Sequence, residues 1–309
     1  VTAANPTLNT YVSVCPGGTA TDVCSAASNI NPFQYRSTPN MVIVKLGPDS
    51  AVKFYNNAGS VQMIADLLGW FVEGAPTGAT YYPVTPTRVM TFQPVAAGQM
   101  YTMTLPNIPA GASAVAINLT AANPTTNTYV SACPGGTPIT SCKSSSNINP
   151  YAGTNTPNMV ILKIGTNGTV SFYNDQGLVQ LMADVQGWYV DGISTAASYL
   201  PVTPTRVMAF QTVGAGQTYT LTLAGAPAGA SAVALNVTSA NQTALTYVSA
   251  CPAGTAVVDC KASSNLNAYP GRHVANMVMV KLGTGNKVTF YNDKGTTQLI
   301  ADVQGWYVN

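Results

Sequence analysis

The side chains in this sequence that could react with one another are lysine, asparagine and aspartate, set in otherwise apolar segments. Lys45 follows Met-Val-Ile-Val, and Asp184 lies in Ala-Asp-Val-Gln-Gly-Trp-Tyr. An unpaired charge in an apolar strand costs free energy, so each of these charges needs a partner. We therefore predict a structural polar network in which aspartates pair with arginine or lysine. Its charged members are Lys45, Asp66, Arg88, Lys163, Asp184, Arg206, Lys281 and Asp302.

Asparagines recur beside these charges and allow two interpretations. In the first, their side chains bind backbone groups and hold loops in place. In the second, a buried, neutral lysine attacks an asparagine amide and releases ammonia while a carboxylate moves the protons. The product is an intramolecular isopeptide bond, as in β-sandwich domains of Gram-positive surface adhesins. We favour the structural network, because almost any domain of this size holds these residue types. The asparagines are Asn29, Asn147 and Asn265, and Asn40, Asn158 and Asn276.

The six cysteines form three pairs with the same spacing: Cys15 and Cys24, Cys133 and Cys142, and Cys251 and Cys260. A metal site is disfavoured because the chain has one histidine and the spacing is not that of a zinc knuckle. We predict three local disulfides, each closing a short loop. In the chain-entropy model, each disulfide stabilises the folded state by about 2.5–3 kcal/mol. Disulfides indicate an oxidising compartment, and therefore an extracellular or cell-surface location.

Three tryptophans, Trp70, Trp188 and Trp306, each follow an aspartate by four residues. In an unbroken strand each would share the face of its aspartate. Exposed tryptophans could form a sugar-stacking platform, as in carbohydrate-binding modules, whereas buried ones would pack in the core or between repeats. We favour the packing role for these residues, and for Tyr11, Tyr129 and Tyr247.

The residues of common catalytic sites are scarce. His273 is the only histidine and Glu73 the only glutamate, which disfavours a Ser-His-Asp triad and a pair of glycosidase carboxylates. Only 7% of the residues are charged, and the net charge is +2. Nucleic-acid binding needs clusters of Lys and Arg, and the sequence contains no such cluster. We expect no enzymatic activity, no cofactor and no metal.

A repeat of 118 residues organises the chain. Asn9-Thr-Tyr-Val-Ser-Val-Cys-Pro-Gly-Gly recurs from Asn127 and, with changes, from Leu245. The repeat predicts three parts: residues 1–73 as the second half of a unit, and 74–191 and 192–309 as complete units, with short linkers near 73–80 and 191–198. Residues 1–73 lack the front half that Tyr81–Ala116 provides in the second unit.

Each complete unit contains seven or more short segments rich in Val, Ile, Thr, Tyr and Phe, separated by Gly, Pro and Asn turns. No segment keeps a helical period with caps. The fold class predicted is all-β, with tandem Ig-like or jelly-roll-like β-sandwich repeats; a small β-barrel is the alternative. No apolar run is long enough for a membrane-spanning helix.

Three motifs resemble a known repeat: Tyr81-Tyr-Pro-Val-Thr-Pro-Thr-Arg, Ala114-Val-Ala-Ile-Asn-Leu-Thr and Ala183-Asp-Val-Gln-Gly-Trp-Tyr. They are similar to tandem modules in secreted proteins of actinobacteria and related bacteria. Such modules are often appended to secreted hydrolases or cell-surface proteins, and the resemblance implies no activity of the module itself.

These observations favour an extracellular structural or adhesive repeat protein, as a subunit of a surface appendage or filament-like assembly. A surface with few charges allows chains to pack together at small desolvation cost. We expect self-association in which another chain supplies the strands that residues 1–73 lack. The alternative is a carbohydrate- or cell-wall-binding module.

Overall fold

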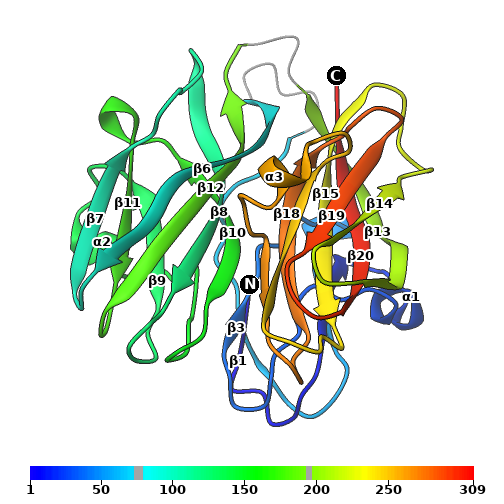
Figure 1. Cartoon of the computed structure of the whole chain (residues 1–309), viewed down its shortest axis with the longest axis horizontal. Helices are drawn as coiled ribbons and strands as arrows, with labels where there is room; N and C mark the ends of the chain where they lie inside the picture. Colours follow the sequence, from blue (N-terminus) through cyan, green and yellow to red (C-terminus); the bar gives the residue numbers. More distant parts are fainter. Residues whose placement is uncertain (73–78, 193–196) are drawn as a thin grey trace. The chain divides into compact units, whose positions relative to one another are not determined.

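The computed structural model describes residues 1–72, 79–192 and 197–309 (Figure 1). The chain forms two compact units, one made of Val1–Ala65 with Tyr199–Asn309 and the other of Asp66–Ser198. The boundaries of these units differ from those of the repeats, because the repeats are defined by sequence similarity and the units by packing. The linkers predicted near 73–80 and 191–198 contain residues 73–78 and 193–196, which lie outside the described residues.

The unit Asp66–Ser198 contains the second repeat, folded as two antiparallel sheets. One sheet has the order β10-β8-β12-β6 and the other β7-β11-β9. A short helix, α2 (Ile139–Cys142), follows β9, and a 3-10 turn (Thr166–Gly168) precedes β11. The strands are β6 (Thr80–Val95), β7 (Gln99–Thr104), β8 (Ala112–Ala122), β9 (Val130–Pro134), β10 (Thr156–Lys163), β11 (Thr169–Asn174) and β12 (Val179–Val190).

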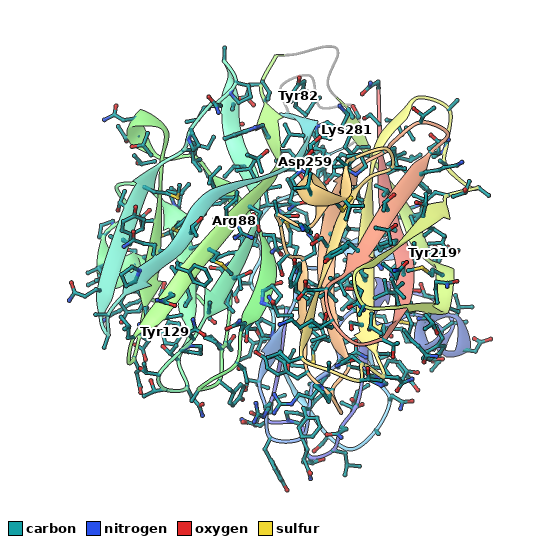
Figure 2. The ribbon with its side chains drawn as sticks, in the orientation of Figure 1. Tyr82, Arg88, Tyr129, Tyr219, Asp259 and Lys281 are labelled. Carbon is teal, nitrogen blue, oxygen red and sulfur yellow. A yellow bond between two sulfur atoms is a disulfide. The ribbon has the colours of Figure 1, made fainter. Side chains whose placement is uncertain are left out.

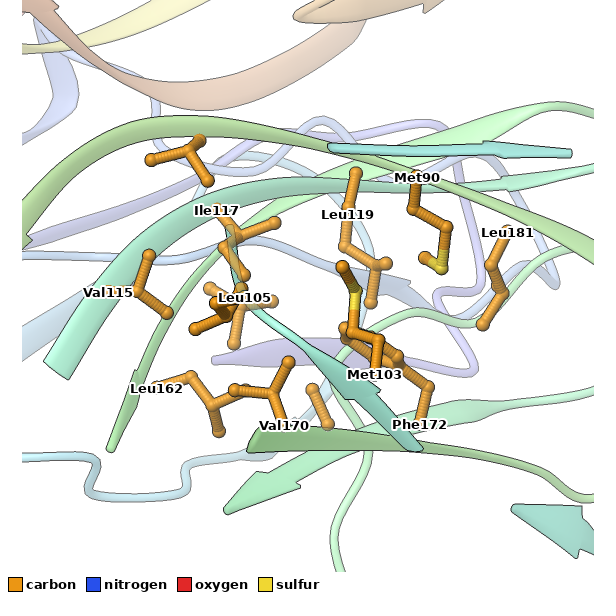
Figure 3. Close-up of a cluster of buried hydrophobic side chains, with 14 of the residues drawn as sticks. Met90, Met103, Leu105, Val115, Ile117, Leu119, Leu162, Val170, Phe172 and Leu181 are labelled. Carbon is orange, nitrogen blue, oxygen red and sulfur yellow. The ribbon is translucent and has the colours of Figure 1, made fainter. Parts of the chain in front are cut away.

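Alternate residues of these strands form the core between the two sheets. Ile117 and Leu119 of β8 face Val170 and Phe172 of β11, and all four are buried (Figure 3). This alternation follows from the two-residue period of a strand, and two packed apolar faces define a sandwich. The prediction of an all-β sandwich is confirmed.

The third repeat folds in the same way within the other unit, with sheet orders β13-β20-β15-β18 and β14-β19-β16-β17. Its core includes Val233, Leu235, Phe290 and Trp306. The elements are β13 (Ser198–Val213), β14 (Gln217–Thr222), β15 (Ala230–Ala240), β16 (Thr246–Pro252), α3 (Val257–Cys260), β17 (Leu266–Ala268), β18 (Val274–Lys281), β19 (Lys287–Asn292) and β20 (Thr297–Val308).

Residues 1–65 belong to the same unit and contain shorter strands. Their sheets have the orders β3-β1-β5 and β2-β4. These strands align, 118 residues earlier, with parts of β10, β8, β12, β9 and β11 of the second repeat. Within residues 1–65, no strand aligns with β6 or β7. The elements are β1 (Thr2–Ala4), β2 (Val12–Pro16), α1 (Thr21–Ser25), β3 (Thr38–Pro39), a 3-10 turn (Pro48–Ser50), β4 (Val52–Asn56) and β5 (Gln62–Ile64).

A bulge interrupts β12, where the register shifts between Val185 and Gly187. Core residues alternate up to Val185 and resume at Trp188, so the strand changes face at this point. Asp184 and Trp188 therefore lie on opposite faces, unlike the shared face expected for an unbroken strand. The bulge also gives room to the buried Tyr81, whose hydroxyl donates to the carbonyl of Gln186 at 2.9 Å.

In the described part of the chain, no helix has the length and apolar character needed to cross a bilayer.

Replacing Gly187 with alanine tests the close packing at this bulge. A Cβ atom at Gly187 would overlap the ring of Tyr81. We expect Gly187→Ala to lower the free energy of unfolding by about 1–3 kcal/mol, because overpacking forces the ring from its site. Urea unfolding followed by tyrosine fluorescence measures the change. Gly225→Ala, where a Cβ would meet nothing within 4 Å, is the matched control. Equal stability of the two variants would contradict this account.

Candidate functional site

The three cysteine pairs are bonded in the structure: Cys15–Cys24, Cys133–Cys142 and Cys251–Cys260. Each bond joins the end of a strand to the short helix that follows it. A tyrosine fixes the same loop from the strand side. The hydroxyl of Tyr129, labelled in Figure 2, donates to the carbonyl of Lys143 at 3.1 Å. The cystine loops are thus structural parts of each repeat.

Two asparagines of each copy hold the chain that follows the cystine loop. In the first copy the Asn29 Oδ1 accepts from the backbone N–H of Val14 at 2.6 Å. The amide nitrogen of Asn40 donates to the Asn29 carbonyl at 2.6 Å. The corresponding bonds recur through Asn147 and Asn158, and through Asn265 and Asn276. Side-chain to backbone bonds of this kind replace the pairing that a loop cannot provide for itself.

An arginine and an aspartate form a two-pronged ion pair in each complete repeat. Arg88 donates to both carboxylate oxygens of Asp184, at 2.5 and 3.0 Å. Arg206 donates to those of Asp302 at 2.8 and 3.0 Å. Both aspartates are buried, so each needs this charge-assisted pair. Burial raises the pKa of Asp302, and the hydrogen bonds and charge of Arg206 oppose that rise.

The three lysines lie elsewhere. Lys163 and Lys281 end β10 and β18, and their side chains, like that of Lys45, are exposed. Lys281 is labelled in Figure 2. Because their side chains are exposed, the burial cost that suggested a partner for these three predicted network members does not arise. Lys163 and Lys281 sit where their strands end, and Lys45 lies outside the described strands. An isopeptide bond requires a buried, neutral lysine, and these positions do not meet that requirement.

Asp66, the first-copy counterpart of Asp184 and Asp302, is exposed. The charged members of the predicted network therefore meet in two places, at Arg88 with Asp184 and at Arg206 with Asp302.

A buried amide cluster joins residues 1–65 to the third repeat within their common unit. The Asn40 side chain donates to Asn236 Oδ1 at 2.9 Å and accepts from the backbone N–H of Met277 at 3.0 Å. Asn29 donates to Gln304 Oε1 at 3.4 Å, and Asn236 donates to the carbonyl of Ser28. The side chains of this cluster, Asn29, Asn40, Asn236 and Gln304, are all buried. Buried amides without such partners would cost about 1–3 kcal/mol each, so the cluster fixes how these two parts pack.

Sequence reasoning did not predict this cluster as an interface. A signal was present, because Asn118 and Gln186 recur as Asn236 and Gln304 at the repeat offset, in otherwise apolar strands. The partner of each amide depends on tertiary packing, which the repeat pattern does not contain.

Two strands of residues 1–65 end their sheets with unpaired edges, and we call β4 and β5 the open edges. In the second repeat, β7 pairs with β11 and β6 pairs with β12. β4 and β5 align with β11 and β12, but among the described residues each pairs on one side only. Phe54 of β4 is 39% exposed, whereas its counterparts Phe172 and Phe290 are 1% and 0% exposed. Val52 is 38% exposed, and its counterparts Val170 and Val288 are fully buried.

The tryptophans divide in the same way. Trp188 and Trp306 are buried core residues, whereas Trp70 is 64% exposed. Trp70 belongs to the segment 66–72, part of the second unit, where Leu67, Leu68 and Val72 are also exposed. Phe71 of that segment stacks near Tyr189, with ring centroids 6.1 Å apart. A sugar-stacking row of three tryptophans is therefore not formed.

His273 lines a small cleft of about 140 Å³ in the first unit, beside Asn9, Thr10 and Phe33. The guanidinium of Arg272 lies 5.6 Å from the Phe33 ring centroid. Among the described residues, no group of three or more His, Cys, Asp or Glu side chains is placed to hold a metal ion.

Comparison with known proteins adds little to this description. No family model matches the chain, and no curated protein matches it. Among solved structures, the STIV MCP is similar with a TM-score of 0.19 and 11% identity, over 74% of this chain and 97% of the other. A chain of the Sulfolobus turreted icosahedral virus structure gives a TM-score of 0.22 and 12% identity, over 99% of this chain and 78% of the other. At these scores, neither likeness bears on function.

The Asp302 pair predicts a pH dependence of stability. Since the pKa of Asp302 is higher in the folded protein than in the unfolded chain, stability falls as pH rises from the unfolded pKa through the folded pKa. Arg206→Ala removes the interactions that lower the pKa of Asp302, so the fall in stability should extend to higher pH. The free energy of unfolding at pH 7 should decrease by about 3 kcal/mol. Asp302→Asn should abolish this component. Urea unfolding between pH 4 and 7 measures both, with Lys281→Ala, at an exposed position, as control. An Arg206→Ala curve parallel to the control would refute the assignment.

The amide cluster predicts that Asn40 holds residues 1–65 on the third repeat. Asn40→Ala leaves the buried Asn236 Oδ1 and the Met277 N–H without their partner, at a cost of about 1–3 kcal/mol. Hydrogen exchange should accelerate in β1 and β18 of this variant. Asn57→Ala, at an exposed position of the same copy, should leave exchange unchanged. Unaltered exchange in Asn40→Ala would show that the cluster does not hold the parts together.

Proposed function

We propose that this chain is an extracellular structural protein whose repeats build an assembly, and that copies associate through the open edges of residues 1–65. The observation that carries this proposal is the exposure of Val52 and Phe54. The residues at the corresponding positions of both complete repeats are core residues. An unpaired strand edge with apolar side chains is a template for pairing with another chain. Burying a phenylalanine alone contributes about 2 kcal/mol.

The location and the structural role have separate support. Three disulfides fit an oxidising, extracellular environment. The buried asparagine side chains have specific partners and serve to hold loops and to join residues 1–65 to the third repeat. These features support a structural role for the polar side chains of the repeats.

One residue of the open edge departs from the complete repeats. Lys53 stands where Ser171 and Thr289 bond to hydroxyls of the neighbouring strand. Charged residues, lysine above all, are common on edges that avoid pairing. Here the Lys53 ammonium donates to the Thr19 carbonyl and the Thr21 hydroxyl, both at 2.9 Å. Its charge is therefore engaged on the chain's own loop, and Val52 and Phe54 remain the exposed side chains of β4.

Glycan binding ranks second. It has the exposed Trp70 in its favour, but the two corresponding tryptophans are buried in the core. A single tryptophan offers one stacking surface, without the row of exposed aromatics that the glycan-binding alternative requires.

Adding a front half repeat to the 309-residue chain tests the proposal. Residues 74–118 placed ahead of Val1 restore the natural order of the repeat, because Val1-Thr-Ala-Ala-Asn-Pro corresponds to Leu119-Thr-Ala-Ala-Asn-Pro. We expect the unmodified chain to self-associate as concentration rises and the extended chain to remain monomeric, because its edges are paired internally. Sedimentation velocity over a wide concentration range measures both.

The matched control carries the same extension with Tyr101→Asp and Met103→Asp in the added copy. These changes place charges on the strand that should cover β4, so self-association should return. A chain that stays monomeric without the extension, or an assembly that the extension leaves intact, would contradict the proposal.

A further inference from the structure

We infer that the cleft beside His273 binds a small carboxylate anion that carries further oxygen atoms, as a sugar acid or a hydroxy acid does. The cleft, of about 140 Å³, lies within the unit of Val1–Ala65 and Tyr199–Asn309, where loops of the first and third copies meet. Its size suits a ligand no larger than one monosaccharide, because pockets for drug-sized molecules hold about 300–1,000 Å³. The site goes beyond the proposed function and does not depend on self-association.

Two asparagines of the first copy line the cleft and offer hydrogen-bond donors to it. Asn9 Oδ1 accepts from the backbone N–H of Gln34 at 2.8 Å, and Asn31 Oδ1 accepts from Ser28 Oγ at 2.9 Å. Within the described residues, the amide nitrogens of these two side chains make no hydrogen bond. Because the oxygen of each amide is already used by the chain, the group left for a ligand is a donor.

A guanidinium at the wall of the cleft supplies positive charge. Arg272 stands between Gly271 and His273, which both line the cleft. Its guanidinium carbon lies 5.6 Å from the ring centroid of Phe33, a third lining residue, and 5.7 Å from that of Tyr269. In the described part of the chain this guanidinium forms no ion pair. A guanidinium that packs its face on aromatic rings keeps the N–H groups of its edge for a planar carboxylate.

The surroundings of Arg272 favour an anion beside it. Burial lowers the pKa of its guanidinium, the charge of Arg36 lowers that pKa further, and Tyr269 opposes both effects. The described residues that line the cleft include no Asp or Glu. A bound carboxylate would therefore compensate a partly buried charge and reduce the repulsion between the two arginines.

The loop 269–273 is held in place by a side chain that the other copies lack. The buried Gln242 donates from its amide nitrogen to the backbone carbonyls of Tyr269 and Arg272. Proline, which has no such donor, stands at the corresponding position of both other copies. The second copy also has threonine and asparagine where the third has Arg272 and His273. The cation and the side chain that positions its loop are thus both departures from the second repeat.

These groups define which ligands fit. The carboxylate pairs with the guanidinium of Arg272, and the other oxygens of the ligand accept from the amide groups of Asn9 and Asn31. Phe33 provides an apolar wall. A neutral sugar leaves the charge of Arg272 uncompensated, and a plain carboxylate leaves the two amides unused, so both should bind more weakly than a molecule that carries both features.

The test uses His273 as the reporter, because it is the only histidine and its imidazole NMR signals need no assignment. We expect glucuronate, a sugar acid, or L-malate, an open-chain hydroxy acid, to shift these signals saturably in the 309-residue chain. The dissociation constant should be on the order of 1 mM for a ligand of this size. The acid that binds more tightly identifies the source of the carboxylate.

Glucose and acetate are the matched ligands, added at the same pH and ionic strength because imidazole signals respond to both. Each should bind at least about tenfold more weakly than the better acid. No saturable shift with either acid, or binding of glucose or acetate as tight as that of the acids, would overturn the inference. This comparison uses the unmodified chain, so it decides the question even where a variant fails to fold.

Variants of Arg272 test which group holds the carboxylate. Arg272→Gln removes the charge from a side chain of similar polarity and should weaken binding by at least about tenfold, whereas Arg272→Lys keeps the charge and should lose less. Lys281→Gln is the control, because Lys281 is exposed at the far end of β18, which begins next to the cleft at Val274. It should bind within about twofold of the unmodified chain. Unchanged binding in Arg272→Gln would overturn the assignment.

Discussion

Pairing between the two halves of a repeat is the constraint on which the rest of this structure depends. A sandwich buries its apolar faces only when both sheets are complete, and here β6 and β7, or β13 and β14, close the sheets that the back half begins. Where those strands are present, Phe172 and Phe290 are core residues. Next to β4, where the described residues contain no such strand, Phe54 is exposed although it too lies between a valine two residues before it and a tyrosine after it. Burial in this fold is therefore decided by strand pairing and not by residue type.

Much of the fold could be predicted from the sequence, because it follows from local patterns. The 118-residue repeat, the all-β class and the local cysteine pairs rest on spacing and alternation. The face of Trp188 could not be predicted, since the bulge at Val185–Gly187 depends on the ring of Tyr81, which comes from a strand about a hundred residues away. The exposure of the lysines could not be predicted for a similar reason. The neighbouring strands determine at which residue a strand leaves the core.

The buried polar groups form two kinds of hydrogen bond: some hold a loop within one repeat, and others join one repeat to another. Asn29 and Asn40 hold their own loop through bonds that recur in each copy, and the same side chains also contact Gln304 and Asn236 of the third repeat. Internal copies could predict the first role, because it repeats every 118 residues. The bonds to Gln304 and Asn236 form only where residues 1–65 pack on the third repeat. Each side chain is therefore constrained both by its own loop and by the neighbouring repeat, and similarity among the copies indicates only the constraint of the loop.

This double use explains how an incomplete repeat can be ordered. Residues 1–65 lack the strands that would close their sheets, yet the amide cluster gives them buried partners in the third repeat. Because amides in such a cluster must match donor to acceptor, it fixes position more strictly than an apolar contact of equal area would. The half repeat is thus anchored through its loops while β4 and β5 stay unpaired. An edge held in place by other contacts loses little further conformational entropy when a strand is added to it, which is the condition for binding by strand addition.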